Sequence, residues 1–201
     1  TGRAFPQAGL EWKLPWARRD GRFTQIVEPI VSLVMAPSSQ NQDKIPNEDS
    51  LSFEFDDTNL FSENRFGGID RVEGGSRITY GLNSGIFGNN SGFSSFFIGQ
   101  SYRFRKDNDF GADTGLDGHF SDIVGRVEIS PTRYVDALYR FRLDKDDLTP
   151  RRSEVQATLG VPEFRLSVNY LSIDQQNLSD ILDPEDEFPD REEITVGFSS
   201  Q

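Results

Sequence analysis

Arginines at alternating positions are the residues of this chain with the most distinctive chemistry. Near the end of residues 93–105, Arg103 and Arg105 share one face, and near the end of residues 134–143, Arg140 and Arg142 do the same. A guanidinium group presents a rigid fork of N–H donors that can grip a phosphate or a carboxylate through two parallel hydrogen bonds. Side chains of this kind could hold an anionic substrate, line a wet cavity, or pair with Asp122, Glu128 and Asp136 on neighbouring strands. The basic residues that we expect on inward faces are Arg103, Arg105, Arg126, Arg140 and Arg142.

A second candidate site is the polar loop that begins at residue 59 and leads into an alternating segment ending at residue 82. A connection that only has to stay in water does not need two phenylalanines, yet this one carries Phe61 and Phe66. The loop therefore either folds back onto the protein or binds another molecule. We expect the two phenylalanines to form a small core, and Arg65, Asp70 and Arg71 to pair with one another.

Enzymatic chemistry has little support in the sequence. His119 is the single histidine, and its neighbours Ser121 and Asp122 are too close in sequence to form a typical catalytic triad. Carboxylate pairs are abundant, but nothing places two of them across a cleft as a glycosidase requires. Nucleophile-elbow and phosphate-binding glycine motifs are missing from the sequence. We therefore predict no catalytic residue, no cofactor and no metal site.

The composition favours a β-rich protein that does not bind nucleic acid. The chain has 201 residues, of which 35% are hydrophobic and 12% aromatic, including 17 phenylalanines. Disordered chains are usually poor in aromatic residues, so this balance suits strands with a polar residue at every second position. A net charge of −12 argues against a nucleic-acid surface. Without cysteine, these residues can form neither a disulfide framework nor a thiolate metal site.

Period-two alternation predicts about nine strands along the chain. Pro15 and Pro29 cannot donate to a strand ladder, so each should mark a bulge, a strand end or a local break. The predicted strands are residues 8–16, 23–35, 77–87, 93–105, 122–130, 134–143, 154–159, 164–170 and 194–198.

The connections between these strands alternate in length. Short ones follow residues 17, 87, 130 and 160, and long ones follow residues 36, 105, 143 and 173. Short turns at one end and long loops at the other are typical of a transmembrane β-barrel, and aromatic residues gather near both ends of the predicted strands. A soluble sandwich or jelly roll also alternates, but it does not require this rhythm. We therefore predict an all-β, antiparallel, up-and-down segment of a larger transmembrane barrel.

Two of the long loops are acidic, at residues 107–117 and 183–190. Clustered carboxylates suit Ca²⁺ or Mg²⁺, but the spacing matches no calcium-loop motif. A solvated face that repels anionic neighbours is the preferred interpretation.

Several short motifs stand out in the first half of the chain: Ile26-Val27-Glu28-Pro29, Leu60-Phe61, residues 64–71, residues 77–82, and Ile98-Gly99-Gln100 with Tyr102. These motifs resemble the barrel domain of the LptD family of lipopolysaccharide-assembly outer-membrane proteins, also called OstA or Imp. They keep their order and spacing over residues 23–105, and beyond residue 105 the similarity is weaker and rests on the strand pattern. The motif residues, expected to be structural or to contact the plug or lipopolysaccharide, are Glu28, Pro29, Leu60, Phe61, Asn64, Arg65, Phe66, Gly67, Gly68, Asp70, Arg71, Arg77, Tyr80, Gly81 and Gln100.

The resemblance implies a location and a set of partners. Residues 1–201 would be part of a C-terminal barrel in the outer membrane of a Gram-negative bacterium, surrounded by outer-membrane lipid. A periplasmic jelly-roll domain, absent from this chain, would receive lipopolysaccharide from a periplasmic Lpt bridge, and a plug lipoprotein, LptE, would sit inside the barrel. The family's lateral gate lies between the first and last barrel strands, which we do not expect here. The chain begins without methionine and has an odd number of predicted strands, so we expect it to be a piece of a longer protein.

Two functions from different classes follow. The first is non-enzymatic transport of lipopolysaccharide and its insertion into the outer leaflet. The alternative is a passive porin-like channel, or a surface enzyme on a barrel scaffold. For the loop after residue 59, the favoured interpretation is an ordered cap, folded inward, that also touches the plug.

Overall fold

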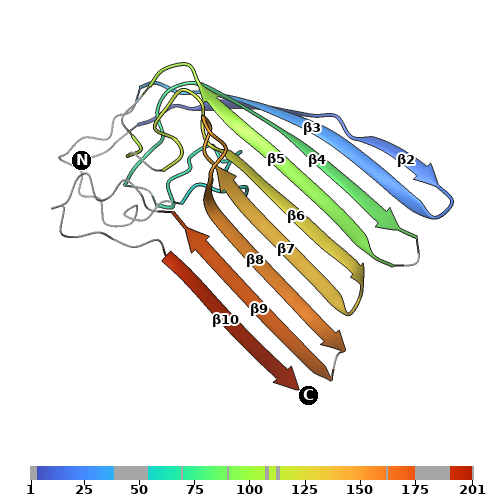
Figure 1. Ribbon diagram of the computed structural model, residues 1–201. Helices are drawn as coiled ribbons and strands as arrows, with labels where there is room; N and C mark the ends of the chain where they lie inside the picture. Colours follow the sequence, from blue (N-terminus) through green and yellow to red (C-terminus); the bar gives the residue numbers. More distant parts are fainter. Residues whose placement is uncertain are drawn as a thin grey trace, which may run out of the picture.

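The computed structural model describes residues 4–38, 54–68, 70–89, 91–106, 109–111, 114–161, 163–174 and 191–200. Within these ranges, ten antiparallel strands form one sheet, and from β2 onward consecutive strands lie side by side (Figure 1). No helix in the described part of the chain is long and apolar enough to cross a membrane. The strands are β1 (Ala8–Lys13), β2 (Trp16–Asp20), β3 (Phe23–Met35), β4 (Arg77–Gly88), β5 (Phe93–Arg103), β6 (Ile123–Thr132), β7 (Val135–Leu143), β8 (Pro150–Val161), β9 (Phe164–Ile173) and β10 (Arg191–Ser200).

The up-and-down order confirms the predicted all-β topology. The sheet runs β1-β3-β4-β5-β6-β7-β8-β9-β10, with β2 paired to β3 beside β1. The predicted first strand is therefore two strands that share one neighbour, which accounts for ten strands where nine were expected. β8 starts at Pro150 instead of Glu154, so the connection before it, residues 144–149, is shorter than the other loops at its end of the sheet.

The break between β1 and β2 falls where two prolines occupy adjacent rungs of the ladder, since the flanking register places Leu14 opposite Pro29 and Pro15 opposite Glu28. The β1–β3 pairing ends at Lys13 opposite Ile30, and the β2–β3 pairing begins at Trp16 opposite Val27. Leu14 donates to the carbonyl of Pro29 at 3.2 Å, but neither Pro29 nor Pro15 has an N–H to return a bond, so the regular ladder is interrupted here. Pro29 does not interrupt its own strand, since β3 continues through it and pairs with Leu82 of β4.

The two faces of the sheet differ sharply in polarity. One face, here called the inner wall, packs against the loop formed by residues 54–76; its buried side chains include Arg77, Thr79, Ser101 and Arg103. The opposite face, here called the outer wall, exposes large apolar side chains. Examples from across the sheet are Leu10, Trp12, Leu82, Val155, Leu166, Ile194, Val196 and Phe198. Alternation along each strand puts these two sets on opposite faces.

Candidate functional site: a loop packed against the inner wall

Glu73 of the loop forms ion pairs with three arginines. Oε1 of Glu73 accepts a hydrogen bond from Arg103 at 2.7 Å and from Arg65 at 3.2 Å, while Oε2 lies 3.5 Å from Nη2 of Arg77. The side chain of Glu73 is fully buried, and the three arginines are at most 4% exposed. Arg77 and Arg103 face each other on β4 and β5, so the loop contributes Glu73 and Arg65 to a site whose other half is the sheet.

Arg65 fastens the loop both to itself and to the wall. Its guanidinium donates to the backbone carbonyl of Leu60 at 3.1 Å and to Oγ of Ser101 on β5 at 2.8 Å. Burial lowers the pKa of Arg65 to about 10, and the neighbouring positive charges of Arg77 and Arg103 act in the same direction, whereas Glu73 opposes them. The side chain remains a cation at neutral pH, so it needs the carboxylate of Glu73 beside it.

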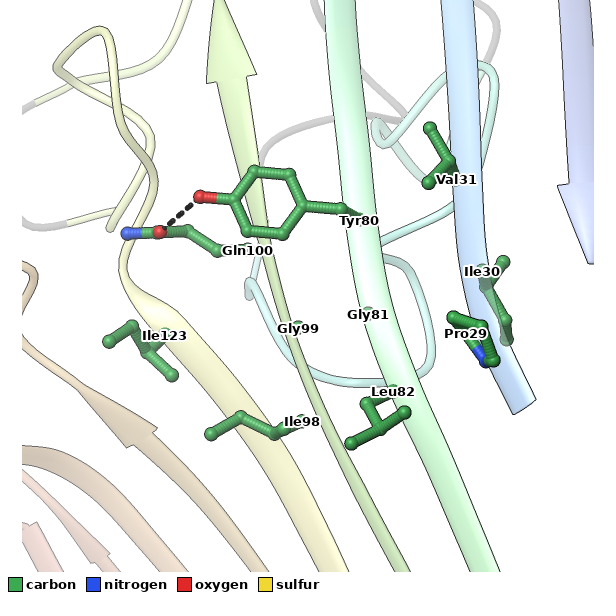
Figure 2. A pocket seen from close by; sticks show the side chains of 10 residues that line it. All are labelled: Pro29, Ile30, Val31, Tyr80, Gly81, Leu82, Ile98, Gly99, Gln100 and Ile123. Carbon is green, nitrogen blue, oxygen red and sulfur yellow. Dashed lines mark hydrogen bonds between the residues drawn. The ribbon is translucent and has the colours of Figure 1, made fainter. Parts of the chain in front are cut away.

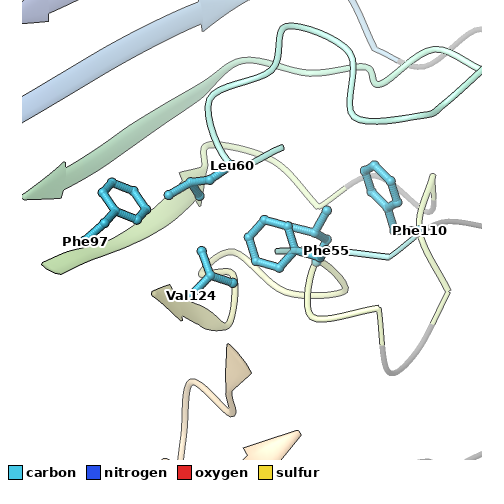
Figure 3. Packing of buried hydrophobic residues seen from close by; sticks show 6 residues of the cluster. Phe55, Leu60, Phe97, Phe110 and Val124 are labelled. Atoms are coloured by element: carbon cyan, nitrogen blue, oxygen red, sulfur yellow. The ribbon is translucent and has the colours of Figure 1, made fainter. Parts of the chain in front are cut away.

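Apolar packing accompanies this charged cluster. Phe55 and Leu60 of the loop are fully buried and pack with Phe97 of β5 and Val124 of β6 (Figure 3). The following long connection closes the cluster with Phe110 and Leu116. Because residues from the wall and from two loops share this core, the loop conformation is linked to the sheet by burial as well as by charge.

Two glycines make room for the loop on the wall. A β-carbon on Gly99 would lie 2.5 Å from Cδ2 of Leu60 and 2.9 Å from the carbonyl oxygen of Tyr80. A β-carbon on Gly81 would lie 3.0 Å from the carbonyl oxygen of Ile98 and 3.3 Å from the ring of Phe61. These two positions pair with each other on β4 and β5, so they form one flat area on which the loop rests.

A second charged contact holds the beginning of the loop. Asp57 lies 3.1 Å from Nη1 of Arg126 and 3.4 Å from Nε of Arg140. Burial raises the pKa of the Asp57 carboxyl, although both arginines act in the opposite direction. Beside this contact, Arg152 of β8 pairs with Glu54 at 3.2 Å and with Glu154 at 3.0 Å. The arginines of the inner wall are thus matched by carboxylates of the loop.

The predicted inward arginines are only partly brought together. Arg103, Arg126, Arg140 and Arg142 lie on the inner wall, and Arg142 is 3.6 Å from Asp122, whose pKa is raised by burial. Arg105 lies beyond the end of β5 and is exposed, so it is not part of this surface.

Phe61 and Phe66 both pack against the protein. Phe61 meets the ring of Phe97 edge-on at 6.2 Å, and Phe66 stacks on Phe110 at 4.6 Å. The two phenylalanines are therefore attached to the edge of a larger core instead of forming one by themselves.

The polar motif residues of the loop shape its turn. Asn64 accepts a hydrogen bond from the backbone N–H of Glu73 at 3.0 Å and donates to the carbonyl of Arg71 at 3.2 Å, which closes the loop on itself. Asp70 is half-buried, and Gly67 faces open space, where a side chain would meet nothing. Gly68 is half-buried, and its role as a contact residue stays a prediction.

Other motif residues lie on the strands. Glu28 lines a polar hollow of about 370 Å³ on the inner wall together with Arg126 and Glu128. Tyr80 and Gln100 lie on the outer wall, where the phenol donates to the amide oxygen at 2.6 Å. The motif therefore contributes to both faces of the sheet.

The sequence missed the carboxylates that organise this site. Glu73 was not predicted: Arg65 was expected to pair with Asp70 within the loop, and Arg103 was expected to line a wet wall or to pair with carboxylates on neighbouring strands. Asp57 and Glu54 were also missed, since the partners of Arg126 and Arg140 were sought on neighbouring strands. A signal was present: three acidic residues and Phe55 stand together at residues 54–57, at the start of the loop that carries Arg65 and Arg71.

The candidate catalytic residues are engaged in structural bonds. The Nδ1 atom of His119 lies 2.9 Å from the carbonyl oxygen of Arg103. The Ser121 hydroxyl donates to the backbone carbonyl of Asp122 at 2.7 Å and accepts from the N–H of Ser101 at 2.9 Å. Among the described residues, no three histidine or acidic side chains converge so as to hold a metal ion. The acidic stretch 183–190 lies outside the described residues, as does part of 107–117.

Fold and site together define a class of protein. An up-and-down antiparallel sheet, apolar on its outer wall and charged on its inner wall, with a loop buried against the inner wall, is a segment of a β-barrel with an occupied interior. A family model described as "LptD: LPS transport system D" matches residues 1–194. The chain belongs to the LptD family.

Individual relatives match shorter stretches. The chain is 36% identical over 70 residues to the LPS-assembly protein LptD of Nitrosospira multiformis, covering 35% of this chain and 7% of that protein. It is 31% identical over 109 residues to the protein of the same name from a Polaromonas species, covering 52% and 13%. The protein of that name from Cupriavidus necator is 29% identical over 135 residues, covering 62% and 16%. The matched stretches are therefore a small part of each relative.

Proposed function

We propose that the protein containing this chain transports lipopolysaccharide to the outer leaflet of a Gram-negative outer membrane, and that this chain is part of the barrel wall. The observation that carries the proposal is the family match over residues 1–194, joined to a sheet with an apolar outer wall and a charged inner wall. Moving an amphiphile breaks no bond. It requires a polar interior for the head group and a lipid-facing exterior, and no catalytic residue.

The loop would act as a fixed lining of the barrel interior. Glu73 and Asp57 already neutralise part of the positive charge of Arg65, Arg77, Arg103 and Arg126. The remaining polar hollow beside Glu28, Arg126 and Glu128 would face the lumen, where a plug lipoprotein of the LptE type would lie. Delivery from a periplasmic Lpt bridge would take place through a domain outside this chain.

The test is depletion of the full-length protein in its native bacterium, with lipopolysaccharide at the cell surface measured by an impermeant label. Surface lipopolysaccharide should fall on depletion and recover when the full-length gene is restored. Unchanged surface lipopolysaccharide, with altered uptake of small solutes, would instead identify a passive channel and contradict the proposal.

A further inference from the structure

The outer wall carries an apolar groove directly behind the loop site. The groove has a volume of about 420 Å³ and is lined by residues of four strands, with outward side chains that include Val31, Tyr80, Leu82 and Ile98 (Figure 2). Its volume falls in the range of small-molecule sites, roughly 300–1,000 Å³. The missing side chains of Gly81 and Gly99 would point the other way, toward Phe61 and Leu60, so the groove opens on the outer wall alone.

A second, polar hollow adjoins the groove where β5 ends. It has a volume of about 520 Å³ and is lined by Lys106, His119, Phe120, Lys145 and Asp146. Gln100 lines both hollows. The outer wall therefore has an apolar compartment and a charged compartment that meet at one side chain.

Gln100 is held rigidly at this junction by the protein itself. Its amide oxygen accepts the Tyr80 hydroxyl at 2.6 Å, and its amide nitrogen donates to the carbonyl of Ser121 at 2.9 Å. Both ends of the amide are satisfied, so a ligand could lie across it without leaving a polar group unpaired.

The polar hollow is lined by two lysines and one aspartate, in an otherwise acidic chain. The chain has a net charge of −12 and only four lysines, of which Lys106 and Lys145 line this hollow. Asp117 and Asp146 hold Lys145 at 3.3 Å and 3.8 Å, while Lys106 is exposed.

Aromatic side chains stand beside the lysines. Phe104 and Phe120 are 51% and 48% exposed, and Tyr102 packs between them at 5.7 Å and 4.8 Å. Exposed aromatic rings at the end of a membrane-spanning strand are typical of the level of lipid head groups.

We propose that this surface binds one phosphorylated acyl lipid of the surrounding leaflet, with an acyl chain in the groove and the phosphate at the exposed Lys106. Charge complementarity selects the occupant, because lysines beside an apolar surface at the interface attract anionic head groups. The proposal rests on the proposed function, which places the outer wall in a membrane.

The test uses the full-length protein purified in a neutral detergent and native mass spectrometry to count bound lipid. The probes are phosphatidic acid, diacylglycerol with the same acyl chains, and inorganic phosphate. Lys106→Glu should reduce retention of phosphatidic acid about tenfold, since each lysine near an anionic surface contributes about 1 kcal/mol and the substitution reverses its charge. Arg133→Glu makes the same charge change at the opposite end of the sheet and should leave retention unchanged.

The groove is tested by filling it. Leu82→Trp should reduce retention of phosphatidic acid several-fold, whereas Val155→Trp, at an outer-wall position of equal exposure, should not. If the protein retained diacylglycerol as well as it retains phosphatidic acid, the phosphate and its lysine would play no part in binding. Binding of inorganic phosphate alone, with Leu82→Trp retaining as much lipid as the wild-type protein, would remove the role of the groove. Lipid retention is measured on purified protein and surface lipopolysaccharide is measured in cells. A negative result for lipid binding can therefore be told apart from a negative result for transport.

Discussion

Glu73 of the loop accepts a hydrogen bond from Arg103 of the wall at 2.7 Å, with both side chains buried. The two residues are 30 positions apart in sequence, and this contact joins the loop to β5. Since Arg65 and Arg77 surround the same carboxylate, removing it would leave three buried cations without their shared anion.

Glu73→Gln should therefore release the loop. Breaking a buried ion pair by removing one partner costs about 3–5 kcal/mol, because the other charge remains buried and unpaired. The measurement is hydrogen exchange of residues 54–76 in the full-length protein, where the variant should lose protection. Glu63→Gln, at an exposed position of the same loop, is the control; equal protection in the wild-type protein and Glu73→Gln would contradict the prediction.

The flat area at Gly99 gives a second prediction. Gly99→Ala places a methyl group against Leu60 and the backbone of β4, and overpacking of this kind costs about 1–3 kcal/mol. Leu60→Ala alone should also loosen the loop, because the cavity it leaves lowers stability by about 2–5 kcal/mol. The double variant should lose less stability than the sum of the two, since the shortened side chain makes room for the added methyl group.

The coupling between the two positions would be measured from the protease sensitivity of the loop in the wild-type protein, in Gly99→Ala, in Leu60→Ala and in the double variant. Gly67→Ala is the matched control, because nothing lies within 4 Å of the added carbon. Strict additivity would show that Gly99 does not support Leu60.

Asp57 predicts a pH dependence of the opposite sign to that of most paired carboxylates. Burial raises the pKa of Asp57, so the docked loop binds this proton more tightly than the released loop does. Docking through Asp57 should strengthen as the pH falls through the raised pKa, and the gain should be complete below the ordinary aspartate pKa of about 3.9. Asp57→Asn should abolish this gain while changing docking at pH 7 by no more than about 1 kcal/mol, because its partners Arg126 and Arg140 are 34% and 26% exposed and keep their contact with water when the carboxylate is lost.

A nitroxide attached through Glu63→Cys reports the mobile fraction of the loop between pH 7 and pH 4. The mobile fraction should fall on acidification in the parent protein and stay level in Asp57→Asn. A mobile fraction that rises with acid in the parent, and not in Asp57→Asn, would reverse the assigned sign.

The strands and their faces could be read from the sequence because alternation reports burial directly. β3 was predicted with its observed bounds, and the inward placement of Arg103, Arg140 and Arg142 follows from period two alone. Pro15 and Pro29 marked the break beside β2, since a residue without an N–H cannot complete a ladder.

The partners of the arginines could not be read in the same way. Glu73 lies 8 residues from Arg65 and 30 from Arg103, and which loop carboxylate reaches them depends on the path of the backbone. The turn closed by Asn64 sets that path, and Gly99 and Gly81 allow the loop to approach the wall. Loop composition indicated that the phenylalanines needed a place to pack, but the receiving residues, Phe97 and Phe110, belong to β5 and to another loop.

The most direct test joins the loop contact to transport. In the native bacterium, the full-length protein would be replaced by Glu73→Arg, by Arg103→Glu, and by the double variant that exchanges the two charges, at matched protein levels. Surface lipopolysaccharide should fall in both single variants and partly recover in the exchanged one, because the double variant restores one anion among three cations. Normal surface lipopolysaccharide in both single variants, with the loop released by hydrogen exchange, would show that the packed loop has no part in transport.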